Sequence, residues 1–210
     1  MYKRQRLDKG VSALDFGVNF KTSTEKVKPN KLQYVLNRLL PNFIRIKECR
    51  EVADDFNARY DAISKTYLYV IERKVENPLL IEVCWHPIFD FDIETFRNVS
   101  KLYVGNHCFD FFGSEEEKDG KILSIEDVWV EEKGNYVLWR VKGRSFLRYQ
   151  VRFMVGTAYE IAAGRTSIAE ITSRLDGTNK TTVHHKAPAS GLILEKVEYD
   201  FERSENLAKE

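Results

Sequence analysis

Few side chains in this sequence match a known catalytic or ligand-binding motif. The metal-binding pattern HExxH, the phosphate-binding P-loop and the dinucleotide-binding GxGxxG are absent, and no spacing of Ser, His and Asp suggests a triad. His184 and His185 have no partners in the sequence, so the pair is interpreted as solvated loop histidines. Asp8, which precedes Lys9 and Gly10, is by itself the type of residue that forms a turn. Any chemistry must therefore be argued from combinations of residues.

Positive charge is concentrated in two places along a chain that is otherwise balanced. The sequence contains 33 Lys and Arg residues against 32 Asp and Glu, a formal net charge of +1, so any basic surface must be local. The first concentration surrounds the single acid Asp8 and consists of Lys3, Arg4, Arg6 and Lys9. The second is interrupted only by Glu160 and consists of Arg144, Arg148, Arg152 and Arg165.

Of these charged side chains, Arg152 is the strongest candidate for a functional residue. It lies within an apolar pattern of helical spacing whose members are Leu147, Val151, Met154, Val155, Ala158, Ile161 and Ala162. Because a guanidinium does not lose its charge, an arginine that points inward from such a helix requires a carboxylate or phosphate partner. Tyr67, by contrast, lies in an expected strand, where an aromatic residue is more often part of the core.

The hydrophobic periodicity and the turn residues predict a mixture of helices and antiparallel strands. Strands are expected at residues 11–20, 43–46, 66–72, 122–130, 136–141 and 191–201, with a hairpin turn at 131–135. Helices are expected from Pro29 to a stop at Pro41, from a cap at Asp92 to near Gly105, at 147–163 and at 167–175. This order does not alternate strictly between strand and helix, so the expected fold class is α+β.

Composition indicates an ordinary globular protein, with 43% hydrophobic and 31% charged residues. The three cysteines are widely spaced and form no CxxC, so neither a disulfide framework nor a zinc site is expected. The N-terminus has no apolar core of a signal peptide, and no apolar stretch approaches the roughly 20 residues that span a bilayer. We therefore expect a soluble, cytoplasmic protein.

Six segments, taken in order, resemble the TruA family of tRNA pseudouridine synthases. They are RLDKGVSA at 6–13, LNRLLPNFIR at 36–45, DFNARY at 55–60 followed by Tyr67 and Tyr69, GNHCFDFF at 105–112, FLRYQVRFMVG at 146–156 and APASGLIL at 187–194. Each segment is a weak signal alone. Their order and spacing, which cover nearly the whole chain, identify the sequence as similar to this family, and the DKGVSA version resembles archaeal and eukaryotic members.

The resemblance implies a fold and an organisation. Members of the family have two ferredoxin-like halves that share an extended, mostly antiparallel sheet flanked by helices. Residues 1–85 would then form the remainder of the N-terminal half, with the Asp8 loop, and residues 86–210 the C-terminal half, with the Arg152 helix and the closing strand. Two prolines, Pro78 and Pro87, favour a boundary within residues 75–92.

The resemblance also implies a reaction, in which uridine in the anticodon stem-loop of tRNA becomes pseudouridine without a metal or other cofactor. Asp8 would be the nucleophile, kept ionised by Arg152, whose charge lowers the pKa of a nearby carboxyl group. Tyr67 would stack on the base and donate a hydrogen bond, and Leu192 and Leu194 would form apolar walls. The candidate phosphate contacts are Arg6, Arg59, Arg144 and Arg148.

The sequence departs from the family at its beginning. Gln5 and Leu7 stand where the family has Gly and Thr, and Asp8 follows Met1 without the strand, helix and strand that precede the catalytic loop in other members. An inactive, N-terminally truncated fragment or a non-catalytic RNA-binding module is therefore the alternative expectation. A structural ferredoxin-like domain without an RNA role is a third, because one fold hosts many functions. Bacterial members are dimers and some eukaryotic relatives act alone, so a homodimer is one of two expected assemblies.

Overall fold

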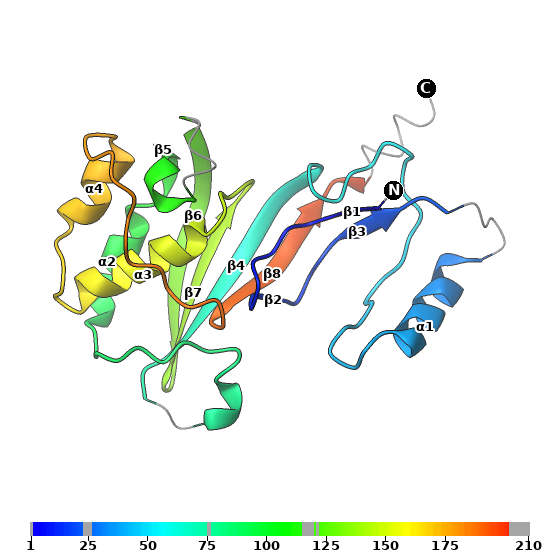
Figure 1. The fold of residues 1–210 in the computed structure, drawn as a ribbon, viewed down its shortest axis with the longest axis horizontal. Helices are drawn as coiled ribbons and strands as arrows, with labels where there is room; N and C mark the ends of the chain where they lie inside the picture. The colour runs from blue at the N-terminus through cyan, green and yellow to red at the C-terminus, as the bar shows by residue number, and fades with distance from the viewer. Residues whose placement is uncertain (1, 23–26, 75–76, 115–119, 121, 202–210) are drawn as a thin grey trace. The chain divides into compact units, whose positions relative to one another are not determined.

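The computed structural model describes residues 2–22, 27–74, 77–114, 120 and 122–201. The chain is divided into two compact units (Figure 1). The small unit is drawn from residues 1–5, 17–61 and 199–210, and the large unit from residues 6–16 and 62–198. The expected division into halves at residues 85 and 86 stays a prediction, because halves that share one sheet need not be separate compact units.

The described part of the small unit contains a two-stranded sheet and the helix α1. Strand β1 (Tyr2–Arg4) pairs antiparallel with β3 (Val18–Phe20). Helix α1 (Pro29–Leu39) begins with the expected proline, whose fixed φ suits the first turn, and ends before Pro41, as predicted. No residue of α1 is buried.

The strand expected at residues 43–46 was wrong. The segment begins in a turn, in which the amide of Ile44 donates to the carbonyl of Pro41 at 2.9 Å, and it is not paired in a sheet; side chains of α1 bind its backbone instead. The side chain of Asn37 donates to the carbonyl of Ile46 at 3.0 Å and accepts from the amide of Ile46 at 2.8 Å, while Gln33 donates to the carbonyl of Lys47 at 2.8 Å. Amide side chains thus satisfy backbone groups that a neighbouring strand would otherwise bind.

The single strand expected at residues 11–20 was also wrong, since the chain bends between β2 (Ser12–Ala13) and β3. At the bend, the amides of Leu14 and Asp15 both donate to the carbonyl of Leu194, at 2.9 and 3.4 Å. The carboxylate of Asp15 accepts from the amide of Val197 at 2.9 Å. Local alternation of apolar residues could not reveal this bend, because the contacts that fix it come from the other end of the sequence.

A six-stranded mixed sheet forms the framework of the large unit, in the order β2-β8-β4-β7-β6-β5. The remaining strands are β4 (Ala62–Glu72), β5 (Gly105–Cys108), β6 (Ile122–Lys133), β7 (Tyr136–Gly143) and β8 (Leu192–Tyr199). Strand β2 runs parallel to β8, whereas the β4–β7, β7–β6 and β6–β5 pairs are antiparallel. The expected α+β class is confirmed, and β5 is a strand that the sequence pattern did not predict.

The expected hairpin is confirmed as β6 and β7, which pair from Ile125 opposite Gly143 to Lys133 opposite Tyr136. Its turn is shorter than predicted and consists of Gly134 and Asn135. Gly134 has φ of 61°, the left-handed conformation that such tight turns demand and glycine adopts at little cost.

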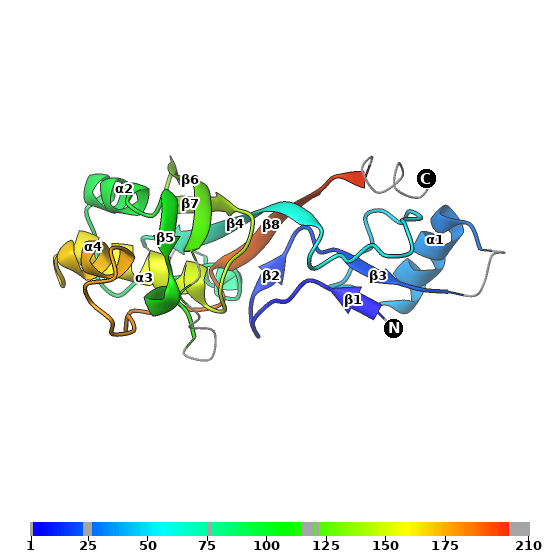
Figure 2. The same ribbon diagram turned by 90° about the horizontal axis from the view of Figure 1, so that it is seen from above.

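Three α-helices lie in the described part of the large unit, and both views show them gathered beside β5, β6 and β7 (Figures 1 and 2). They are α2 (Ile93–Lys101), α3 (Gln150–Ala162) and α4 (Ala169–Leu175), with short 3-10 turns at Pro78–Leu80 and Asp110–Phe112. The cap predicted at Asp92 is confirmed by a 2.6 Å hydrogen bond from the amide of Thr95. Helix α3 begins three residues later than expected, because Tyr149 adopts a left-handed backbone with φ of 68°.

Helix α3 and the sheet enclose the main core. Met154 on α3 and Trp139 on β7 are fully buried. The Tyr103 hydroxyl donates to the Met154 carbonyl at 2.9 Å, and the Trp139 indole donates to Ser100 at 2.9 Å, so the polar groups of these large residues are satisfied inside the core. Almost every residue of α3 is buried, which makes the partly exposed Arg152 an exception on that helix.

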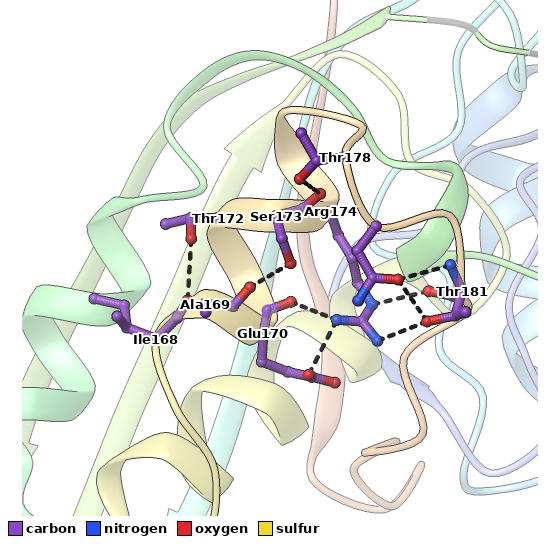
Figure 3. Close-up of polar contacts among 9 residues, drawn as sticks. Ile168, Ala169, Glu170, Thr172, Ser173, Arg174, Thr178 and Thr181 are labelled. Carbon is purple, nitrogen blue, oxygen red and sulfur yellow. Dashed lines mark hydrogen bonds and ion pairs between the residues drawn. The ribbon is translucent and has the colours of Figure 1, made fainter.

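A buried arginine fixes the chain that follows α4 (Figure 3). Arg174 is 3% exposed and donates to the carbonyl of Thr181 at 2.8 Å and to the carbonyl of Glu170 at 2.9 Å. It also lies 3.0 Å from the Glu170 carboxylate. These contacts tie the polar loop after Asp176 back to α4, and the amide of Val183 then donates to the carbonyl of Phe111 at 2.9 Å.

We expect the Arg174→Met variant to lower the free energy of unfolding by about 2–3 kcal/mol, because it removes the hydrogen bonds of a buried, charged guanidinium to the carbonyls of Thr181 and Glu170. Chemical denaturation of the two proteins measures this difference. Arg165→Met is the matched control, since Arg165 is 46% exposed in its pair with Glu160 and such pairs contribute about 1 kcal/mol or less. Equal losses in the two variants would show that Arg174 does not anchor the loop.

Candidate active site

Asp8 lies at the turn that enters β2, as the sequence predicted. The amide of Val11 donates to the carbonyl of Asp8 at 3.2 Å and closes the turn. Gly10 has φ of 84°, and a Cβ atom there would lie 3.3 Å from the Cβ of Ala189. The glycine therefore serves both the turn conformation and the close approach of the segment before β8.

Two guanidinium groups approach the Asp8 carboxylate from the region of α3. Nη1 of Arg152 lies 3.9 Å from Oδ2, and Nε of Arg148 lies 4.0 Å from Oδ1. Both distances exceed those of hydrogen bonds, so these arginines act on the carboxylate through their charge. The side chains of Asp8 and Arg152 are only 16% and 12% exposed, which limits screening by water.

Burial dominates the ionisation of Asp8 and raises its pKa above the ordinary value of 3.8. The opposing influences come from the positive charges of Arg152, Arg148, Arg6 and Lys186, in decreasing order. The charge of Arg152 by itself lowers this pKa, as was expected from the sequence. The net shift of the pKa is nevertheless upward, because partial removal of the carboxylate from water outweighs the nearby cations.

The chain before β8 holds Arg152 in place. Nε of Arg152 donates to the carbonyl of Ala187 at 2.8 Å, and the amide of Ala187 donates back to the carbonyl of Arg152 at 3.1 Å. Gly156 lies so close to this segment that a Cβ atom would fall 2.1 Å from the carbonyl oxygen of His185. The guanidinium has the carboxylate partner that an inward-pointing arginine on this helix was expected to need.

Tyr67 lies on β4 opposite Val141 of β7, and its ring meets that of Phe146 edge to face at 5.1 Å. Burial first, and then the Asp8 carboxylate, raise the pKa of Tyr67 to about 12. The hydroxyl therefore stays protonated at neutral pH and can donate a hydrogen bond. The dependence on Asp8 also shows that Tyr67 and the carboxylate share one electrostatic environment.

The other residues predicted to form the site do not all lie beside Asp8. Arg6 is exposed but close enough to influence Asp8, so it joins Arg148 and Arg152. Arg144 is exposed on the segment between β7 and α3, while Arg59 belongs to the small unit and stacks on the Tyr60 ring at 5.1 Å. Leu192 and Leu194 are both buried on β8, and Leu192 packs within the main core.

Two residues of this site, Lys186 and Tyr149, were not predicted from the sequence. Lys186 directly precedes the APASGLIL segment, so its position beside a recognised motif was the available signal. Three cations lie over the Tyr149 ring, at 4.5 Å for Lys186, 4.7 Å for Arg148 and 5.5 Å for Arg152. No local pattern indicates this role for Tyr149, since a tyrosine in the left-handed conformation is rare.

A partly desolvated carboxylate among several cations is suited to nucleophilic or general-base chemistry on an anionic substrate. Among the residues that the structure describes, no three His, Cys, Asp or Glu side chains are grouped as metal ligands. The searched residues likewise contain no helix long and apolar enough to cross a membrane. The α+β framework and this site thus define the class of the protein as an enzyme whose site centres on one carboxylate among several cations.

Comparison with known proteins resolves this class into a family. Residues 99–200 match the family model described as tRNA pseudouridine synthase. The chain is 34% identical over 196 residues to tRNA pseudouridine synthase A of Thermoanaerobacter sp. (strain X514), which covers 92% of this chain and 80% of the relative. The corresponding enzyme of Aquifex aeolicus is 36% identical over 193 residues, or 91% and 79% of the two chains.

A third relative, tRNA pseudouridine synthase A 2 of Bacillus anthracis, is 34% identical over 196 residues, covering 92% of this chain and 80% of the relative. This chain belongs to the tRNA pseudouridine synthase A family. The predicted resemblance is confirmed. These relatives are bacterial, and the likeness of residues 8–13 to archaeal and eukaryotic members stays a prediction.

The raised pKa of Asp8 predicts that Asp8→Asn stabilises the protein at neutral pH. Above the unfolded value of 3.8 the unfolded chain ionises more readily than the folded one, so stability falls as pH rises through the folded pKa. Asparagine does not ionise, so the variant avoids this loss of stability. At pH values below the unfolded pKa, both proteins carry a neutral side chain at position 8 and the difference disappears. Thermal unfolding from pH 3.5 to 8 should show an advantage of Asp8→Asn that grows and then reaches a plateau.

Asp54→Asn provides the control for this measurement, because Asp54 is 96% exposed beside Lys21. Its effect on unfolding should stay within about 0.5 kcal/mol at every pH. A constant or declining advantage of Asp8→Asn across the pH range would contradict the burial of an ionisable carboxylate.

Proposed function

We propose that this chain converts uridine to pseudouridine in the anticodon stem-loop of tRNA, with Asp8 as the nucleophile and without a cofactor. The observation that carries the proposal is the Asp8 carboxylate, partly buried and flanked by Arg152 at 3.9 Å and Arg148 at 4.0 Å. Membership of the tRNA pseudouridine synthase A family supplies the reaction class.

The reaction is an isomerisation and needs no net gain or loss of atoms. An oxygen of Asp8 forms a bond to C1′ of the target uridine while the bond from C1′ to N1 breaks, and the base departs as an anion. After the base rotates, its C5 bonds to C1′ and the Asp8 carboxylate leaves. The C5 hydrogen is then lost as a proton and N1 regains one. A carboxylate can perform both the attack and the departure.

The cations beside Asp8 suit the charge that develops during this sequence. When Asp8 forms its bond it loses its negative charge, and the detached base gains one. Arg152, held by its hydrogen bond to the carbonyl of Ala187, is placed to balance the charge in either location. Because its position is fixed before reaction, little reorganisation is needed as the charge moves.

Access to C1′ requires the target nucleotide to leave its stack. Tyr67, protonated at neutral pH and near Asp8, can stack on the flipped base and donate a hydrogen bond to it. Leu192 and Leu194 would supply apolar walls. The side chains expected to contact phosphates are those of Arg6, Arg59, Arg144 and Arg148. We also expect the protein to be located in the cytoplasm. Of the two expected assemblies, we propose the homodimer.

Tritium release from tRNA transcripts labelled at uridine C5 tests the chemistry directly. The wild-type chain should release tritium, because re-joining through C5 expels that hydrogen, and Asp8→Asn should release none above background. Asp54→Asn serves as the matched control. Absence of release by the wild-type chain while it still binds tRNA would replace this proposal with that of a non-catalytic RNA-binding module.

Phosphate contacts predict a salt dependence of binding that individual arginines control. For single-stranded regions, the slope of log K against log salt should fall by about 0.7 for each phosphate contact removed. We expect Arg6→Gln and Arg144→Gln each to reduce the slope by about this amount in binding titrations with an anticodon stem-loop. Arg165→Gln, which removes an arginine paired with Glu160, should leave the slope unchanged. Unchanged slopes in all three variants would remove Arg6 and Arg144 from the RNA-binding surface.

A further inference from the structure

Tyr149 has a backbone conformation that other residue types rarely adopt. Of the residues that the structure describes, it is the sole non-glycine residue with positive φ, at 68°. A side chain with a Cβ atom is disfavoured there, because the Cβ crowds the following carbonyl oxygen. Such outliers are found where the surroundings over-determine the conformation, and they are concentrated at functional sites.

The surroundings of Tyr149 do fix this conformation. The fully buried side chain of Gln150 accepts a hydrogen bond from the amide of Leu147 at 2.8 Å, and the amide of Gln150 donates to the carbonyl of Leu147 at 3.1 Å. The carbonyl of Tyr149 accepts from the amide of Phe153 at 3.0 Å and so begins α3. The chain is thereby locked on both sides of the tyrosine.

The Tyr149 ring is a meeting point for cations from separate parts of the sequence. Arg148 precedes α3, Arg152 lies on its first turn and Lys186 comes from the segment before β8. All three lie over the ring within 5.5 Å of its centre. The same three cations are among those that act on the Asp8 carboxylate.

Three clustered cations repel one another, and one carboxylate offsets only a single charge. An aromatic ring carries negative electrostatic potential on its faces and attracts cations at this range. The ring of Tyr149 thus attracts the three cations in addition to the attraction from the single negative charge of Asp8. The ion pairs of the two arginines with Asp8, at 3.9 and 4.0 Å, are longer than hydrogen bonds, so the attraction of the ring adds to the other contacts of these side chains, among them the hydrogen bond from Arg152 to the carbonyl of Ala187.

We propose that Tyr149 is a positioning residue of this site, whose ring holds Arg148, Arg152 and Lys186 beside Asp8. This inference rests on the proposed function of Asp8 as the nucleophile. Tyr149 acts through the cations and does not touch the reacting atoms. Lys186 becomes the third cation of the site, contributed by the segment that also holds Arg152 through Ala187.

Three substitutions separate the ring from the backbone conformation. Tyr149→Phe keeps the ring and removes only the hydroxyl group. Tyr149→Leu removes the ring and keeps an apolar side chain in the same conformation, whereas Tyr149→Gly removes the ring and relieves the strain of positive φ. Tyr34→Leu is the matched control, because Tyr34 is an exposed tyrosine of the small unit with Arg38 over its ring at 5.8 Å.

The first readout is the titration of the Asp8 carboxyl carbon by NMR in RNA-free protein, with Asp8→Asn used to assign the signal. The groups whose charges act on this carboxyl are Arg152, Arg148, Arg6 and Lys186, and the neutral Tyr67 shares their environment. Without the ring, the three cations move away from Asp8 and lower its pKa less. The titration of the Asp8 carboxyl should therefore move to higher pH in Tyr149→Leu and Tyr149→Gly. It should stay in place in Tyr149→Phe and Tyr34→Leu.

The second readout is single-turnover tritium release at saturating tRNA from pH 5.5 to 8.5. The Leu and Gly variants should lose more rate at the acidic end of this range than at the basic end, because their Asp8 titrates at higher pH than that of the wild type. Tyr149→Phe should show the same dependence of rate on pH as the wild type. Lys186→Met should reduce the rate at pH 6 in the wild type and have a smaller effect in the Tyr149→Leu background, since the ring and the lysine act together.

Two outcomes would overturn the inference. If the Gly variant titrates and reacts like the wild type, the ring is unnecessary and only the left-handed turn matters. If Lys186→Met has the same effect in both backgrounds, the ring does not hold the lysine. Failure of the proposed function gives a different result, namely no tritium release by the wild-type chain, and the NMR titration then still decides whether Tyr149 controls the environment of Asp8.

Discussion

The structure of the site depends on placing one carboxylate, partly removed from water, among positive charges that do not bond to it directly. Burial raises the pKa of Asp8, and Arg152 and Arg148, 3.9 and 4.0 Å away, oppose that effect. A hydrogen-bonded ion pair would stabilise the carboxylate more strongly and, in the function proposed above, would make it a weaker nucleophile. The longer contacts favour ionisation while leaving the oxygens able to react.

The topology of the large unit is what makes this balance attainable. Strand β2 runs parallel to β8 at one edge of the sheet, which brings the Asp8 turn against Ala189. The segment before β8 is in turn fixed to α3 by the paired hydrogen bonds between Arg152 and Ala187. Arg174 anchors the preceding loop to α4. A series of ordinary structural contacts therefore determines where the charges of the site lie.

The arrangement has a cost in stability, as expected of a site kept for reactivity. Asp8 is partly buried in its charged form, Tyr149 adopts a disfavoured backbone conformation, and several cations lie near one another. Each of these features lowers the stability of the folded chain when RNA is absent. A polyanionic substrate would relieve the repulsion among the cations, so the same features that weaken the free protein favour its complex with tRNA.

The sequence by itself determined the α+β class, the β6–β7 hairpin, the cap at Asp92 and the buried helix that carries Arg152, because these depend on turn residues and periodicity within short segments. Its six ordered motifs also determined the family. Only the tertiary structure decided the bend after Ala13, the unpaired chain at residues 43–46 and the net direction of the Asp8 pKa. It alone placed Lys186 and Tyr149 in the site. These features depend on burial and on contacts between distant parts of the chain, which no local pattern of residues encodes.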